Sequence, residues 1–111
     1  MDIRDVRWSE SEKQIARIAY ELARQRDYHA IRQRITEIIR RAGNQKDDEF
    51  VCRLNDYLRK ACRELDEKYD FRYSVLIYVF ARLIREGLLS EEDLIGLREE
   101  KLEMIRGLLS L

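Results

Sequence analysis

Apolar positions recur every three or four residues over the first third of the chain, which is the spacing of one face of an α-helix. Two sets share this spacing: Ile15, Ile18, Ala19 and Leu22, followed by Ile31, Ile35, Ile38, Ile39 and Ala42. Ser9 and Glu12 fit a capping box before the first set, and Gly43-Asn44 follows the second set as a stop signal. The pattern therefore predicts one long helix that begins after Ser9 and ends at Gly43.

A polar stretch, Arg24-Gln25-Arg26-Asp27, separates the two apolar sets and leaves two interpretations open. An unbroken helix of about 34 residues is about 50 Å long, whereas a compact monomer of this size is only about 35 Å across. One end would project with an exposed isoleucine stripe, which predicts an antiparallel homodimer through Ile31, Ile35, Ile38 and Ile39. A hinge at residues 24–28 would instead fold the helix into a hairpin within one monomer.

Two further helices are predicted between Asn44 and Gly87. The first of them begins near Asp47-Asp48, where acids suit a helix N-terminus, and ends at Tyr69-Asp70. The next spans roughly 72–86 and is apolar on nearly every side, so it must be covered all round. Its run SVLIYVF is also compatible with a strand, but the helical pattern continues without a break through ARLIRE.

A last helix is predicted to open after the cap residue Ser90, because acids fill the turn that follows it. Its buried side would consist of Leu94, Leu97, Leu102, Ile105, Leu108 and Leu109. The sequence thus predicts an all-α protein of four helices in one domain, residues 1–111. A stem of about residues 9–69 would form the dimer, and a smaller helical head would take about residues 70–111.

Charge is abundant but balanced, with 22 basic and 22 acidic residues among 111. A net charge of zero gives no bulk attraction to nucleic acid or to a membrane surface. The apolar stretch 75–84 is about half the length that spans a bilayer, so no membrane insertion is expected. One alternative is that arginines of the first helix contact phosphates, namely Arg17, Arg24, Arg26, Arg32, Arg34, Arg40 and Arg41. Interspersed acids weaken that alternative.

The sequence offers little catalytic or metal-binding chemistry. His29 is the only histidine, and neither a Cys-x-x-Cys motif nor a glycine-rich phosphate loop is present. Cys52 and Cys62 stand ten residues apart, about 15 Å along a helix, which is too far for a disulfide within the chain. We expect them to be partly buried fillers in a reducing cytoplasm, and we expect no enzyme activity, cofactor or metal.

Three stretches of the second half carry a family resemblance. They are Asn55-Asp56-Tyr57-Leu58, Glu64-Leu65-Asp66-Glu67-Lys68-Tyr69-Asp70 and Ser74-Val75-Leu76-Ile77-Tyr78-Val79-Phe80-Ala81-Arg82-Leu83-Ile84-Arg85-Glu86-Gly87-Leu88. This pattern resembles the fluorescence recovery protein family. The resemblance implies an all-helical dimer that binds the orange carotenoid protein of cyanobacteria. It also implies that binding accelerates return of the photoactivated form to the orange resting form and ends photoprotective quenching.

The resemblance also implies a partner-binding patch on the second helix, made of a tryptophan, a histidine, an aspartate and an arginine. Asp56 retains the aspartate, whereas Cys52, Asn55 and Cys62 stand at the other three positions. Arg59 and Arg63 lie on the helix face of Asp56 and would supply positive charge. Tyr78 takes the exposed aromatic position of the head, although it is equally compatible with a core position.

The expected partner-binding set is therefore Asp56, Asn55, Cys52, Arg59, Arg63 and Tyr78. Loss of a tryptophan and an arginine, both common interface anchors, leaves a second hypothesis open. The chain would then be a divergent homologue that serves as a helical dimeric interaction module for a different protein.

Overall fold

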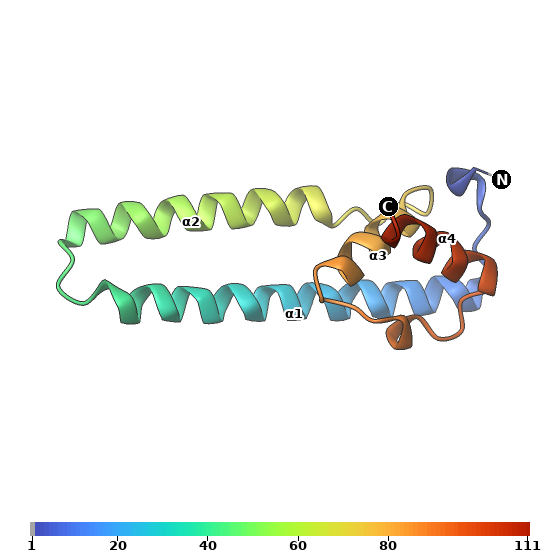
Figure 1. Ribbon diagram of the computed structural model, residues 1–111, viewed down its shortest axis with the longest axis horizontal. Helices are drawn as coiled ribbons and strands as arrows, with labels where there is room; N and C mark the ends of the chain where they lie inside the picture. Colours follow the sequence, from blue (N-terminus) through green and yellow to red (C-terminus); the bar gives the residue numbers. More distant parts are fainter. Residues whose placement is uncertain (1) are drawn as a thin grey trace.

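The computed structural model describes residues 2–111 and contains four α-helices, with no β-strand in that range. They are α1 (Glu10–Ala42), α2 (Asp47–Lys68), α3 (Leu76–Arg85) and α4 (Glu99–Leu109), with short 3₁₀ turns η1 (Ile3–Asp5) and η2 (Glu91–Leu94). α1 and α2 form a long hairpin, and α3 and α4 gather at the end that holds both chain termini (Figure 1). The all-α prediction is confirmed, and segment 76–85 is a helix rather than a strand.

α1 is one unbroken helix, as the capping pattern predicts. The Ser9 hydroxyl accepts from the Glu12 N–H at 3.3 Å, and the Glu12 carboxylate accepts from the Ser9 N–H at 3.1 Å. Gly43 follows the helix with a positive φ of 51°, a conformation that glycine adopts readily. The alternative of a hinge at residues 24–28 is wrong.

The polar stretch in the middle of α1 makes tertiary contacts instead of a break. The Arg26 guanidinium donates to the Leu88 carbonyl and to the Asp93 carboxylate, both at 2.9 Å. Asp27 accepts from two groups at the end of α2. The polar residues that interrupt the apolar stripe therefore form the side-chain contacts of α1 with the end of α2 and with η2.

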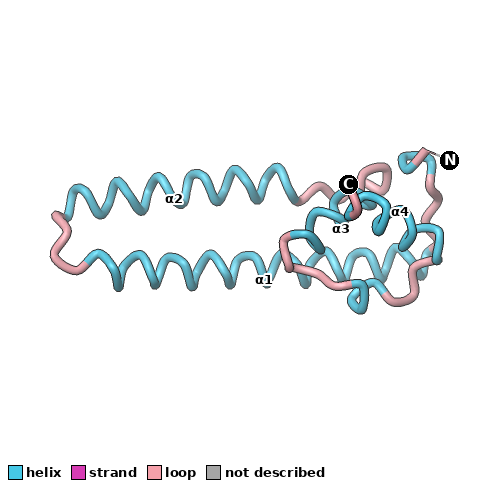
Figure 2. The backbone as a smooth tube through the Cα atoms, viewed as in Figure 1, coloured by secondary structure: helices cyan, strands magenta, loops and turns pink. Residues whose placement is uncertain are grey.

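The molecule is elongated, with extents of 56 × 25 × 22 Å and a radius of gyration of 17.5 Å. A compact chain of this length would have a radius near 13 Å. α2 and residues 28–42 of α1, which we call the stem, extend away from the rest, and the loop that joins them lies at the far tip (Figure 2). The other half of α1, with α3, η2 and α4, forms the part that we call the head.

The hydrophobic core lies in the head. α1 contributes small side chains there, and Ala16 and Ala23 are completely buried. Large fully buried residues come from α3, η2 and α4: Leu76, Ile77, Phe80, Leu83, Leu94 and Ile105. Residues 10–27 thus pack with the head, although the predicted stem of residues 9–69 includes them.

α3 begins at Leu76, four residues later than predicted. A turn holds the preceding residues, and Val75 donates its N–H to the Arg72 carbonyl at 2.9 Å. Phe71 and Tyr73 in this segment pack on neighbouring aromatic rings, with Tyr20 of α1 lying 4.9 Å from the Phe71 ring. These aromatic contacts favour a turn over a further turn of helix, and the spacing of apolar residues in the sequence does not reveal them.

α4 begins at Glu99 rather than after Ser90, so the predicted fourth helix is wrong at its start. Ser90 does form a capping box with Asp93, but it caps only the short turn η2. Gly96 has a φ of 105°, and a Cβ there would lie 2.4 Å from the Ile15 side chain. The positive φ favours glycine at this position, and a larger residue would also have to displace the tip of the Ile15 side chain. This segment separates η2 from α4.

A buried ion pair fixes the same segment to α1. The Glu12 carboxylate accepts from the Arg98 N–H at 3.0 Å and from the Lys101 ammonium at 3.1 Å. Lys101 is completely buried and Glu12 is 2% exposed. Burial alone would raise the pKa of Glu12, but the Arg98 N–H and the Lys101 ammonium lower it to about 2.

Candidate functional site

The outward face of α2 carries most of the expected partner-binding residues. Asp56, Arg59 and Arg63 are exposed and, together with Lys60, line one open hollow of about 590 Å³. This face is opposite the buried residues Ala61 and Leu65, because a helix turns through 100° per residue.

The remaining expected residues lie outside this hollow. Cys52 and Asn55 are exposed on α2 but do not line it. Tyr78 belongs to α3 in the head and is 45% exposed, so it is not a core residue. Lys60 is the lining residue that sequence reasoning missed, although its place four residues after Asp56 was a usable signal.

The two cysteines are not the partly buried fillers that we expected. Both Cys52 and Cys62 are exposed free thiols on α2. The face of α2 that packs on α1 consists instead of Ala61, Leu65 and the aliphatic part of the Lys68 side chain. Both cysteines therefore lie on the accessible surface of α2.

The predicted dimer residues differ in how well a single chain covers them. Ile38 is 7% exposed, Ile31 and Ile35 are half-buried, and Ile39 is 54% exposed. On α2, Val51 is 60% exposed, while Leu54 and Leu58 are half-buried. The stem thus retains uncovered apolar side chains on both of its helices.

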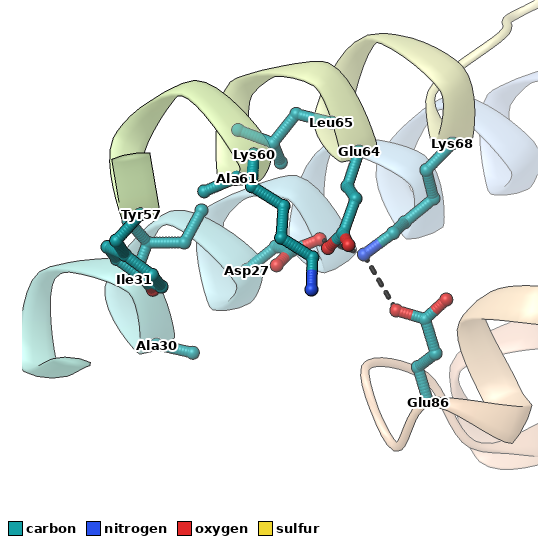
Figure 3. A pocket seen from close by; sticks show the side chains of 10 residues that line it. All are labelled: Asp27, Ala30, Ile31, Tyr57, Lys60, Ala61, Glu64, Leu65, Lys68 and Glu86. Atoms are coloured by element: carbon teal, nitrogen blue, oxygen red, sulfur yellow. Dashed lines mark hydrogen bonds and ion pairs between the residues drawn. The ribbon is translucent and has the colours of Figure 1, made fainter. Parts of the chain in front are cut away.

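A pocket of about 330 Å³ lies where the stem meets the head (Figure 3). At its inner end the Lys68 ammonium lies 2.8 Å from Asp27 and 2.7 Å from Glu86. The Tyr69 hydroxyl donates to the same Asp27 oxygen at 2.9 Å. Because Asp27 belongs to α1 and Glu86 directly follows α3, Lys68 connects three helices at one point.

The pKa values of these groups follow from burial and pairing. Burial alone would lower the pKa of Lys68, but its hydrogen bonds to Asp27 and Glu86 raise it. Burial and the Asp27 carboxylate together raise the pKa of Tyr69. Burial opposes ionisation of Glu86, yet Lys68 and Arg82 hold its pKa below the ordinary value. Lys68 and Glu86 are therefore charged at neutral pH, and their ion pair can hold α2 and the end of α3 together electrostatically.

We expect Lys68→Met to lower the free energy of unfolding by about 2 kcal/mol, as for a hydrogen-bonded charge that loses its partner. In this variant Asp27 still accepts a hydrogen bond from the Tyr69 hydroxyl, and Glu86 still accepts one from Arg82. These remaining bonds limit the loss of stability. Urea unfolding followed by circular dichroism measures the change. Lys60→Met is the matched control, because Lys60 lines the same pocket but is exposed, and it should change stability little.

The fold gives no support to the metal-binding and phosphate-binding sites that the sequence left to be considered. Within residues 2–111 no group of three or more His, Cys, Asp and Glu side chains is placed to hold a metal ion. His29 is exposed on α1. Several of the α1 arginines proposed for phosphate contacts are paired with carboxylates, including Arg26 with Asp93 and Arg40 with Glu37. No helix in the described range is long and apolar enough to cross a membrane.

Comparison with known proteins identifies the family. Residues 8–109 match the family described as photoprotection regulator fluorescence recovery protein. The chain belongs to the fluorescence recovery protein family. The fluorescence recovery protein of Synechocystis sp. PCC 6803 is 34% identical over 101 residues, which cover 91% of this chain and 90% of that protein.

Solved structures of fluorescence recovery proteins share the same fold. The Fremyella diplosiphon protein is 38% identical with a TM-score of 0.81, and the match covers 94% of this chain and 98% of that one. The Synechocystis sp. PCC 6803 structure is 33% identical with a TM-score of 0.84, and the match covers 95% of this chain and 100% of that one. This chain is therefore a fluorescence recovery protein family member in both sequence and architecture.

Proposed function

We propose that this protein binds the photoactivated form of an orange carotenoid protein and accelerates its return to the orange resting form. This would end photoprotective quenching. The proposal rests on the family match over residues 8–109, together with the free outward face of α2 around Asp56. No bond is made or broken in such a role. The protein acts by binding better to conformations on the return path than to the activated state.

We also propose that the active species is a homodimer formed through the stem. Ile39 and Val51 are each more than half exposed, and Ile31, Ile35, Leu54 and Leu58 are incompletely covered. Uncovered apolar side chains on two neighbouring helices favour association, because each copy would remove the other's apolar surface from water. The balance of acids and bases on the chain does not oppose such pairing.

The proposal is tested by following dark reversion of a photoactivated orange carotenoid protein by absorbance. We expect the protein to accelerate reversion, and we expect Asp56→Ala to reduce this acceleration about tenfold, as for a central interface residue. Glu92→Ala is the control, since Glu92 is an exposed acid on η2, away from the stem. An unchanged reversion rate at high excess of the wild-type protein would reject the proposed function.

The second candidate is a dimeric interaction module for a different protein. Cys52, Asn55 and Cys62 favour it, because they replace three large or polar side chains of the family patch with smaller ones. The variant C52W/N55H/C62R separates the two hypotheses in the same reversion measurement. Acceleration by this variant but not by the wild-type chain would support a changed partner.

A further inference from the structure

The inner end of the pocket between the stem and the head is electrically balanced. Lys68 lies 2.8 Å from Asp27 and 2.7 Å from Glu86, and Arg82 lies 2.8 Å from Glu86. Two acids therefore face two bases, and Lys68 is only 6% exposed. Because these charges already compensate one another, the charges of any ligand that enters the pocket must be matched by other residues.

Two exposed residues of α2 carry the charges that remain. Lys60 and Glu64 both line the pocket and lie about one helical turn apart. Within residues 2–111 neither has an opposite charge within 4.0 Å, although side chains at this spacing are able to pair. Figure 3 shows both side chains projecting from α2 to the same side as Lys68. The pocket thus presents one cation and one anion that do not neutralise each other directly.

The rest of the lining is mostly apolar. It includes Ala30 and Ile31 from α1 and Ala61 and Leu65 from α2. Tyr57 adds a hydroxyl, and burial raises its pKa, so this hydroxyl stays protonated at neutral pH and can donate. A volume of about 330 Å³ is at the lower end of the range for small-molecule sites. The pocket therefore has room for one small molecule with an aliphatic part.

We propose that this pocket binds a small zwitterion of the α-amino-acid type with an aliphatic side chain. Its ammonium lies opposite Glu64, its carboxylate lies opposite Lys60 and the Tyr57 hydroxyl, and its side chain contacts the apolar walls. A ligand with a single charge fits less well, because an anion would leave Glu64 uncompensated and a cation would leave Lys60 uncompensated. The pocket acids are not grouped to hold a metal ion in the part of the chain that the structure describes.

L-leucine is the probe, and it is titrated into the isotope-labelled whole chain and followed by NMR. We expect a dissociation constant on the order of 1 mM, as for a ligand of this size in an open pocket, with shifts of the Ala61 and Leu65 amides. Isoamylamine lacks the carboxylate of leucine and isocaproate lacks its ammonium, so each should bind at least about tenfold more weakly. Absence of leucine binding, or equal binding of either analogue, would overturn the inference.

Two variants test the assigned contacts separately. Lys60→Met should remove the preference for leucine over isoamylamine, and Glu64→Gln should remove the preference for leucine over isocaproate, because each variant deletes the partner of one ligand group. Lys46→Met and Glu67→Gln are the matched controls, since both residues are exposed and lie outside the pocket lining. The controls should leave all three affinities unchanged. Preferences that persist in both pocket variants, or that disappear in the controls, would also overturn the inference.

The proposed dimer supplies a competing occupant, because Ile31 lines the pocket and also belongs to the apolar stripe of the stem. The same titration is therefore repeated with Ile39→Asp, which should be monomeric. We expect both forms to bind leucine with similar affinity. Binding by Ile39→Asp alone would mean that the partner subunit fills the pocket in the dimer, and it would overturn the inference. None of these measurements uses a carotenoid protein, so their outcome is independent of the proposed function.

Discussion

Ile39→Asp should convert the protein from a dimer to a monomer. Ile39 is 54% exposed on the stem of a single chain, so the substitution does not disturb the core of that chain. In a stem-to-stem dimer the same side chain would be buried, and an unpaired carboxylate in an apolar interface is strongly unfavourable. We expect the dimer dissociation constant to rise at least about a hundredfold. Light scattering would then report 13.5 kDa instead of twice that mass.

Ile18→Asp is the matched control for this experiment. Ile18 lies on the same helix and is 69% exposed, but it belongs to the end of α1 that packs in the head. It should therefore leave the dimer intact, with circular dichroism unchanged for both variants. Dissociation by Ile18→Asp but not by Ile39→Asp would place the interface in the head. A wild-type chain that is already monomeric in dilute solution would refute the proposed dimer.

Lys101→Met should be the most destabilising of the single substitutions considered, by about 3–5 kcal/mol, because it leaves a buried carboxylate without its counter-ion. Lys101 is 0% exposed, and its ammonium lies 3.0 Å from Glu12. Methionine keeps most of the apolar length of the side chain, which limits any packing loss, but it removes the ammonium that lies 5.2 Å from the centre of the Trp8 ring. Chemical unfolding measures the change.

A double variant separates loss of the ion pair from loss of packing. Glu12→Gln/Lys101→Met removes both charges, while glutamine can still accept from the Ser9 N–H in the capping box. We expect the double variant to recover much of the stability that Lys101→Met loses. Equal instability of the single and double variants would show that Lys101 acts through its packing rather than through its charge.

Acid should weaken the wild-type head through the same pair. The pKa of Glu12 falls from an ordinary value of 4.5 to about 2 in the folded state. The contribution of ionised Glu12 to the free energy of unfolding is therefore complete above about pH 5, and it is lost as the pH falls through 4.5 towards 2. Unfolding free energies measured across this range should fall steeply for the wild type and less steeply for Glu12→Gln.

Much of the fold follows from local pattern. The capping residue Ser9, the 3.6-residue spacing of apolar side chains and the glycines at positions 43 and 87 set the ends and types of α1, α2 and α3 to within a few residues. The start of α4 does not follow, because Ser90 and three acids form a valid cap for either a short turn or a long helix. Contacts of Gly96 and Glu12 with segments far away in the chain decide between them.

Some features of the candidate site also follow from local pattern, whereas others depend on how the helices pack. Helical spacing alone places Asp56, Arg59 and Arg63 on one face of α2, because that relation is local to one helix. Neither exposure of Cys52 and Cys62 nor the role of Asp27 could be read from spacing. Both depend on which side of each helix the neighbouring helix covers.

The amino-acid sequence by itself determined an all-α chain, a long first helix and the family to which the chain belongs. Capping, periodicity and motif spacing are short-range properties, and short-range energies fix them. Only the tertiary structure decided that the polar middle of α1 is a junction instead of a hinge. Asp27 has an ion-pair partner, Lys68, forty-one residues away. Burial makes that pair possible, and burial exists only once the helices have packed together.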